Sequence, residues 1–237
     1  MTIKAIFFDA AGTLINTTRP VGESYASIAK KYGVEVAPEE VTRRFREFFC
    51  SAPPLAFAPA TPEELQAKER QWWKDLVRRV FEIHGSFNHF EDYFSELFAY
   101  FSRAESWSLY PEVAETLKSL KEREFTVCVV SNFDSRLLKI LQGLGLNPWI
   151  DSVVISSRAG FAKPAPEIFH KALALHNLEP REAIHVGDSL GKDVLGASAA
   201  GLGGILLDRA GKMTSAAFPR IGSLEELFPI LGSALPI

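Results

Sequence analysis

The stretch AIFFDAAGTL, residues 5–14, decides the fold that we expect for this chain. Its first four residues are apolar and lead into a carboxylate and a glycine, which is typical of a buried strand of a parallel sheet. Asp9 then lies just past the carboxyl end of a strand, where open α/β sheets bind ligands. Gly12 permits a tight turn and lets backbone amides approach an anion. Taken alone, Asp9 fits a turn-capping role equally well, because Asp is a common turn residue.

Three further apolar runs lead to polar residues that suit the same sheet edge. Because the carboxyl ends of parallel strands share one edge, we expect these residues to share one crevice with Asp9. A carboxylate nucleophile, a hydroxyl, an ammonium and two more carboxylates together suit a phosphate and a metal ion. The runs are 125–130, 153–155 and 183–186, and they lead to Ser131 and Asn132, to Lys163, and to Asp188 and Asp193.

Length and composition limit the class of protein. A chain of 237 residues buries a sizeable core, as one large domain or as a core with a subdomain. The net charge of −3 provides no field to attract nucleic acid or an acidic membrane, and no apolar stretch is long enough to span a bilayer. We expect no signal peptide, because a short strand and Asp9 follow Lys4. Cys50 and Cys128 are too few for a disulfide framework. A cytoplasmic protein is the expectation.

The strand pattern is interrupted between about residues 16 and 105, where helical periodicity takes over. We expect at least three amphipathic helices that bury their apolar faces as a small bundle. Their many aromatic side chains are predicted to be core packing rather than a ligand site. The stripes are Val41, Phe45, Phe48 and Phe49; Leu65, Trp72, Leu76 and Val80, with Trp73 and Val77 beside them; and Phe90, Tyr93, Phe94, Leu97, Phe98 and Phe101.

From about residue 106 onward, strands alternate with helices, which predicts a Rossmann-like, doubly wound parallel sheet. The expected core is therefore residues 1–15 and 106–237, with residues 16–105 as an inserted helical cap. Asp134 is a plausible N-cap, and His185, within a strand, is predicted to be a satisfied core histidine. The expected helices are 111–122, 135–144, 166–176, 193–200 and 224–231, and a further strand is expected at 204–207.

The four motifs, in this order and spacing, resemble those of the haloacid dehalogenase (HAD) superfamily of hydrolases. The family pattern opens Asp-x-Asp-Gly-Thr, whereas this chain has Asp9-Ala10-Ala11-Gly12-Thr13. The helical insertion resembles the family's C1 cap. The Asp-x-Ala-Gly-Thr variant resembles a branch that includes a rhythmically expressed insect protein and its vertebrate homologues, which implies membership but no substrate.

The resemblance implies a role for each motif residue. Asp9 would be the nucleophile and would form an aspartyl-phosphate. Mg²⁺ would be bound by Asp9, Asp188 and the backbone carbonyl of Ala11, with Asp193 in the outer shell or, equally well, a helix N-terminal acid. The residues implied in phosphate binding are Ser131, Asn132, Lys163 and Gly12, and Thr13 would orient the nucleophile loop.

The charges expected at this edge of the sheet favour a bound metal ion. The metal-free dehalogenases of the superfamily also lack the second Asp, but their Gly-Asp-Ser stretch is altered, whereas Gly187-Asp188-Ser189 is intact in this chain. Two carboxylates a few Å apart without a cation repel by about 1–4 kcal/mol at moderate dielectric. One would then become protonated, and a bound Mg²⁺ removes that conflict.

Ala11 replaces the residue that protonates the leaving oxygen in phosphatases of the family. Such general acid–base catalysis contributes about 10²–10⁴ in rate. Three outcomes stay open: another group supplies the proton, the substrate needs none, or the chain has become a binding protein. A phosphonate-cleaving branch with Asp-x-Ala-Gly-Thr uses a Schiff-base lysine of the cap, but Lys30, Lys31, Lys68 and Lys74 all lie in charged contexts.

The cap carries no motif that names a substrate. The expectation is therefore a HAD-like hydrolase, most simply a phosphohydrolase of a small phosphorylated metabolite, with a metal-free 2-haloacid dehalogenase, a phosphonatase-like hydrolase and an impaired binding protein as alternatives. Arg43, Arg44 and Arg46 are candidates for substrate contact, but a solvated helix face is the favoured interpretation. We expect the protein to be a monomer or a homodimer.

Overall fold

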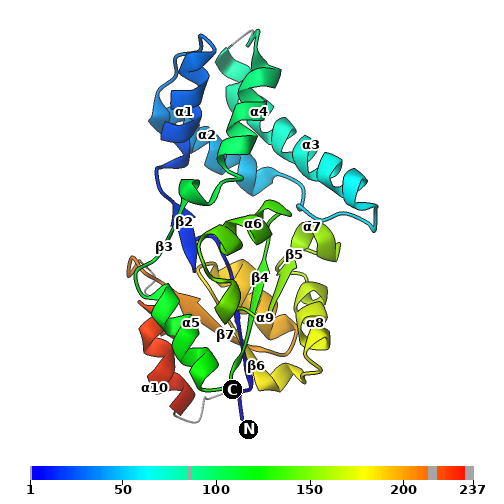
Figure 1. The fold of residues 1–237 in the computed structure, drawn as a ribbon, viewed down its shortest axis with the longest axis vertical. Coiled ribbons are helices and arrows are strands. Elements are labelled where there is room, and N and C mark those ends of the chain that lie inside the picture. Colours follow the sequence, from blue (N-terminus) through cyan, green and yellow to red (C-terminus); the bar gives the residue numbers. More distant parts are fainter. Residues whose placement is uncertain (1, 85–86, 213–217, 233–237) are drawn as a thin grey trace.

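A six-stranded parallel sheet, with strand order β5-β4-β1-β6-β7-β8, lies at the centre of the computed structural model (Figure 1). The structure describes residues 2–84, 87–212 and 218–232. Helices cover both faces of the sheet, which confirms the predicted doubly wound α/β fold. The strands are β1 (Ala5–Phe8), β4 (Thr126–Ser131), β5 (Ser152–Ile155), β6 (Ala183–Gly187), β7 (Gly203–Leu207) and β8 (Arg220–Ile221).

Strand β1 is buried on both faces, which explains its unbroken apolar sequence. Ile6 and Phe8 pack on one face with α5, α6 and α10, and Ala5 and Phe7 pack on the other with α8 and α9. Because successive side chains of a strand point to opposite faces, a sheet covered on both sides needs apolar residues throughout. The helices are α5 (Val113–Glu122), α6 (Arg136–Gly143), α8 (Pro166–Leu175), α9 (Gly196–Ala199) and α10 (Leu227–Gly232).

Four helices lie beyond the carboxyl ends of the strands and form a layer of their own, which we call the cap (Figure 1). Their apolar faces make a third hydrophobic cluster around Tyr25, Val80 and Tyr93. Helix α3 starts with a capping box, in which Thr61 Oγ1 accepts from the N–H of Glu64 and Glu64 accepts from the N–H of Thr61. The helices are α1 (Val21–Lys31), α2 (Pro38–Ser51), α3 (Pro62–Phe81) and α4 (Phe90–Tyr100).

The two connections between the sheet and the cap pair with each other. Strands β2 (Ile15–Thr17) and β3 (Trp107–Leu109) are antiparallel, with Thr17 opposite Trp107. Two strands of three residues are too short to show a period of two, so the sequence pattern did not reveal them. A domain division at residues 15 and 106 remains our proposal.

The predicted elements of the core are present, with ends that differ by one to three residues. Ser131 belongs to β4 rather than to the loop after it, and the helix expected from residue 193 begins earlier, as a π-helix (Leu190–Leu195). Strand β8 and helix α7 (Ser156–Ala159) were missed because each is shorter than a recognisable periodic pattern. Short 3₁₀ turns complete the structure at Glu82–His84, Ala104–Ser106, Asn147–Trp149, Pro180–Glu182 and Leu224–Glu226.

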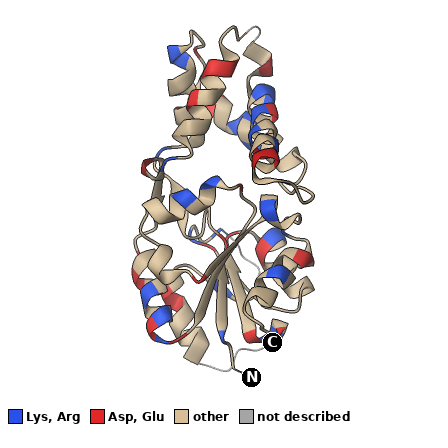
Figure 2. Ribbon diagram, turned by 45° about the vertical axis from the view of Figure 1, so that its right-hand side comes forward, with Lys and Arg blue, Asp and Glu red and all other residues tan. Residues whose placement is uncertain are grey.

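Charged residues are distributed over both layers. Figure 2 shows Lys and Arg interspersed with Asp and Glu along the helices of the cap and of the core. Among the described residues, no helix combines the length and the apolar character that crossing a membrane requires.

Candidate active site

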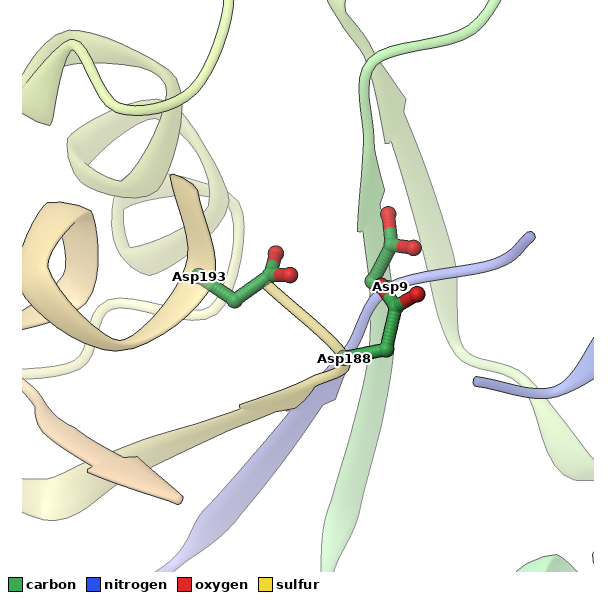
Figure 3. A group of neighbouring side chains, drawn as sticks. All are labelled: Asp9, Asp188 and Asp193. Atoms are coloured by element: carbon green, nitrogen blue, oxygen red, sulfur yellow. The ribbon is translucent and has the colours of Figure 1, made fainter. Parts of the chain in front are cut away.

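The side chains predicted for the site come from adjacent strands and the segments that follow them. Asp9 follows β1, Ser131 ends β4 and Asp188 follows β6, and these three strands are neighbours in the sheet. Lys163 reaches the same edge from the loop before α8, and Asp193 from the π-helix. Figure 3 shows the carboxylates of the three aspartates gathered at this edge. The tertiary structure thus brings together residues that are up to 184 positions apart in the sequence.

The carboxylate of Asp9 is held through one of its two oxygens. Its Oδ1 accepts a hydrogen bond from Ser131 Oγ at 2.8 Å and another from Lys163 Nζ at 2.6 Å. No described residue donates a hydrogen bond to Oδ2, and the residue is 8% exposed. The two donors orient the carboxylate, and Oδ2 is left without a competing partner.

Lys163 is buried and is held in place by Asn132. Asn132 Nδ2 donates to the carbonyl of Lys163 at 2.8 Å, and its Oδ1 accepts from the N–H of Lys163 at 2.7 Å. Burial alone would lower the pKa of Lys163, but the adjacent carboxylates of Asp9 and Asp193 raise it above its ordinary value. The side chain is therefore a fixed ammonium. Asn132 was predicted to bind phosphate, and this clamp on Lys163 was not foreseen.

Asp193 connects Lys163 to the interior of the sheet. Its Oδ1 accepts from Lys163 Nζ at 2.5 Å and lies 3.0 Å from His185 Nε2, and its Oδ2 accepts from the N–H of Ser189 at 2.9 Å. Burial lowers the pKa of His185, so the ring is neutral and donates through Nε2. His185 is a core residue as predicted, but its Nδ1 has no partner among the described residues, and its contact with Asp193 was not foreseen. The alternation of side chains along β6 is the sequence feature that indicates this contact, because it places residue 185 on the opposite face from residues 184 and 186.

Gly12 and Asp188 fit against each other. Gly12 has φ of +91°, and a Cβ at this position would overlap the carboxylate of Asp188. The N–H of Gly12 donates to the carbonyl of Ile15 at 2.8 Å. The N–H of Gly12 is therefore engaged within the loop, and Gly12 makes room for Asp188; its predicted part in phosphate binding stays a prediction.

Two other predicted residues of the same loop keep roles that are untested. No described residue donates a hydrogen bond to the carbonyl of Ala11, which leaves that oxygen free for the role we predict in metal binding. Thr13 is fully buried, and its carbonyl accepts from Arg209 at 2.8 Å. Its hydroxyl has no partner in the described part of the chain, so an orienting role for that group stays a prediction.

The site carries more negative than positive charge. Asp9, Asp188 and Asp193 each offer an oxygen within 4.8 Å of the others, and Lys163 is the ammonium that contacts two of them. Partial burial, together with Asp9 and Asp193, raises the pKa of Asp188 to about 6. A cluster of oxygen ligands with surplus negative charge fits a hard divalent cation such as Mg²⁺.

A cavity of about 500 Å³ lies between the site and the cap. Ala11, Gly12, Asn132 and Asp188 line its end at the sheet. Most aromatic side chains of the cap belong to its hydrophobic cluster, as predicted, and several of them also line this cavity. A helical period shows which residues share a face but not what that face covers. The cap rings that line the cavity are Tyr25, Phe45, Phe49, Trp73, Phe94, Phe98 and Phe101.

The three cap arginines have different environments. Arg43 is exposed and lies near Glu40 and Glu47, as a solvated face requires. Arg44 is buried instead, and it donates to the carbonyls of Val80 and Arg79 at 2.6 and 2.7 Å. Arg46 is exposed and lines the cavity. Because each residue of an α-helix is rotated by about 100° from the one before it, the three side chains point in different directions. The interpretation of all three as one solvated face was therefore wrong.

Two cap residues contact the core beside α6. Glu69, which is buried, accepts from Ser135 Oγ at 2.8 Å, from the N–H of Ser135 at 3.0 Å and from Ser157 Oγ at 2.6 Å. Trp73 Nε1 donates to Asp134 Oδ2 at 2.5 Å. Asp134 also accepts from the N–H of Arg136, where α6 begins, so it caps the helix from one residue farther out than predicted.

Comparison with known proteins gives the family. Residues 3–201 match the family described as haloacid dehalogenase-like hydrolase. The mouse haloacid dehalogenase-like hydrolase domain-containing protein 3 is 35% identical over 100% of this chain and 94% of its own length. The Drosophila melanogaster rhythmically expressed gene 2 protein is 27% identical over 84% of this chain and 80% of its own length.

A solved structure shows the same fold. The HAD-hydrolase YfnB of Bacillus subtilis, bound to magnesium, has a TM-score of 0.76 and 18% identity, and the match covers 98% of this chain and 100% of that chain. The motifs and the family match agree, and the chain belongs to the haloacid dehalogenase-like hydrolases.

Proposed function

We propose that this hydrolase is a Mg²⁺-dependent phosphohydrolase that acts on a small phosphorylated molecule through Asp9. The observation that carries the proposal is the pair of donors, Ser131 and Lys163, on Oδ1 of Asp9, while no residue that the structure describes donates to Oδ2. A hydroxyl and an ammonium at one oxygen of a carboxylate also stand ready to bind the oxygens of a phosphate. Asp188 lies beside them as the additional carboxylate that a divalent cation needs.

In the first step, Oδ2 of Asp9 attacks phosphorus, and the bond from phosphorus to the leaving oxygen breaks. The leaving group departs with the electron pair, and an aspartyl-phosphate remains on Asp9. Lys163 and Ser131 hold the carboxylate in its orientation and stabilise the charge that develops on the phosphoryl oxygens. Asp193 and Asn132 keep the Lys163 ammonium in place.

In the second step, water attacks phosphorus, which releases inorganic phosphate and restores Asp9. A proton from water or from the substrate's surroundings reaches the leaving oxygen, because Ala11 has none to give. Mg²⁺, when bound by Asp9, Asp188 and the carbonyl of Ala11, would neutralise phosphate charge. Asp193 is already engaged by Lys163, His185 and the N–H of Ser189, which supports an outer-shell role for it.

The charge of the site disfavours a metal-free dehalogenase. A 2-haloacid is an anion, and it would enter a site in which three carboxylates face one ammonium. Without a cation, like charges at this distance repel. A phosphonatase-like reaction needs a desolvated lysine in the cap, and none of the described cavity-lining residues is a lysine.

The test is phosphate release from a panel of phosphomonoesters, measured with Mg²⁺ and after its removal with chelator. Asp9→Asn serves as the blank, and Asp75→Asn, an exposed change of the same kind on α3, is the matched control. We expect Mg²⁺-dependent release by the wild type and by Asp75→Asn, and none by Asp9→Asn.

Ala11→Asp restores the missing acid and separates the alternatives. Release that rises about 10²-fold or more in Ala11→Asp, on alkyl esters above all, is expected if the scaffold is a phosphohydrolase without its acid. Halide release from 2-haloacids that chelator leaves unchanged would overturn the proposal. Mg²⁺ binding without turnover in either protein would identify a binding protein instead.

A further inference from the structure

The cavity extends from Ala11 and Gly12, beside Asp9, into a space that aromatic rings of the cap line. Phe49 of α2 and Trp73 of α3 both line it, with ring centroids 6.0 Å apart and planes 25° apart. Phe98 of α4 lines it as well. All three residues are only partly buried. Such a lining binds a flat apolar group in preference to a hydrated one.

Arg136 also lines this space, but it is not free to bind an anion. Its guanidinium lies 4.1 Å from the ring centroid of Phe98 and 4.9 Å from that of Trp73. Asp134 accepts from its Nε at 2.9 Å and from an Nη at 2.6 Å, so its charge is compensated. Arg136 therefore fixes the two rings in position and adds no net charge to the cavity.

The cavity provides no proton for a departing alkoxide. Ala11 stands where the family's acid would be. The described titratable residues that line the cavity are Tyr25, Arg46, Arg136 and Asp188. Arginines stay protonated, the Tyr25 ring is buried, and Asp188 belongs to the proposed metal site. A substrate of this site must therefore have a leaving group that departs as a stable anion.

The two observations point to one class of molecule. We propose that the substrate is the phosphate monoester of an aromatic hydroxyl, whose ring lies among Phe49, Trp73 and Phe98. The inference rests on the proposed function and specifies its substrate. Asp9 Oδ2 forms the new bond to phosphorus, the bond from phosphorus to the phenolic oxygen breaks, and the phenolate leaves with the electron pair and needs no protein acid.

Four phosphorylated compounds, three esters and one acyl phosphate, separate the effect of the ring from that of the leaving group. Phenyl phosphate has both an aromatic ring and an acidic leaving group, benzyl phosphate has only the ring, acetyl phosphate has only the acidic leaving group, and glycerol 3-phosphate has neither. With Mg²⁺ present, we expect kcat/KM to be highest for phenyl phosphate, at least tenfold above each of the others. A kcat/KM for glycerol 3-phosphate equal to that for phenyl phosphate would overturn the proposal.

Binding without turnover tests the ring site independently. Phenylphosphonate and methylphosphonate differ only in the ring, and their dissociation constants are measured by calorimetry on the wild type with Mg²⁺. We expect phenylphosphonate to bind at least tenfold more tightly. Equal dissociation constants for the two phosphonates would contradict the proposed aromatic site, even if phosphate esters are hydrolysed. Tighter binding of phenylphosphonate with no hydrolysis of any ester would support the site and reject the proposed function.

Two neighbouring phenylalanines of α2 make a matched pair. Phe49→Leu removes a ring from the cavity, whereas Phe48→Leu removes one that packs on the guanidinium groups of Arg44 and Arg79, outside the cavity. Phe49→Leu is expected to raise KM for phenyl phosphate about fivefold, which corresponds to one aromatic contact. Phe48→Leu should leave this KM unchanged. Equal effects of the two substitutions would contradict the proposal.

Discussion

Asn132 and Lys163 bind each other through a reciprocal pair of hydrogen bonds, at 2.8 Å from the Asn132 amide to the Lys163 carbonyl and at 2.7 Å from the Lys163 N–H to the Asn132 oxygen. The pair joins the end of β4 to the loop before α8. Through it, Ser131 and Lys163 reach the same oxygen of Asp9 from two separate segments.

Asn132→Ala removes that clamp and leaves every group that contacts Asp9 in the sequence. We expect kcat/KM for a phosphate ester to fall by about 10²-fold, because small misplacements of a catalytic group cost roughly that much. Steady-state kinetics measure the effect, and Asn147→Ala, at an exposed position, is the control. An unchanged kcat/KM in Asn132→Ala would show that Lys163 is positioned by Asp9 and Asp193 alone.

Gly12→Ala tests the contact between Gly12 and Asp188. Gly145→Ala is its matched control, because Gly145 also has a positive φ, +76°, but a Cβ there meets nothing within 4 Å. Both substitutions should cost about 1–2 kcal/mol in free energy of unfolding, because each places a Cβ on a left-handed backbone. Only Gly12→Ala should also abolish Mg²⁺-dependent activity, since it displaces the Asp188 carboxylate. Equal activity of the two variants would mean that Asp188 does not need its present position.

Glu69→Ala tests the contact between cap and core. The substitution leaves the hydroxyls of Ser135 and Ser157 and the N–H of Ser135 without their acceptor. Because such donors are costly when buried, the free energy of unfolding should fall by about 1–3 kcal/mol. Denaturant unfolding followed by circular dichroism measures it. The neighbouring exposed change Lys68→Ala should have almost no effect, and a similar loss in both would argue against the contact.

Asp151→Asn gives a pH-dependent change in stability. Partial burial alone would raise the pKa of Asp151, but hydrogen bonds from Lys121 and from the N–H of Val127 lower it. A carboxyl whose pKa is lower in the folded state stabilises the fold above its unfolded-state pKa. That stabilisation is lost as the pH falls through the lowered pKa. We therefore expect a deficit of about 1 kcal/mol or less at pH 7 that disappears in acid.

Urea unfolding of the wild type and Asp151→Asn at a series of pH values measures the deficit. Lys118→Ala, which removes an exposed ion pair with Glu122 on the same helix, should show no comparable pH dependence. A deficit for Asp151→Asn that stays constant down to the acid range would mean that its pKa is not lowered.

The sequence by itself determined the sheet and the chemistry at its edge. The apolar run of β1, and those of β4 and β6, predict strands buried on both faces, and the position of Asp9, Ser131 and Asp188 at the strand ends follows from chain order alone. These inferences succeed because each depends on local periodicity and on one general property of parallel sheets. The replacement of the family's second Asp by Ala11 is likewise evident from the sequence alone.

Only the tertiary structure decided which faces and atoms meet. Phe49 and Trp73 lie on apolar stripes that the sequence reveals, yet their exposure to the cavity depends on where the cap sits over the core. His185 contacts Asp193, and Asn132 clamps Lys163, because loops distant in sequence approach each other within a hydrogen bond's length. A helical or strand period defines a direction relative to its own element. What lies in that direction is set by packing between elements, which no local pattern contains.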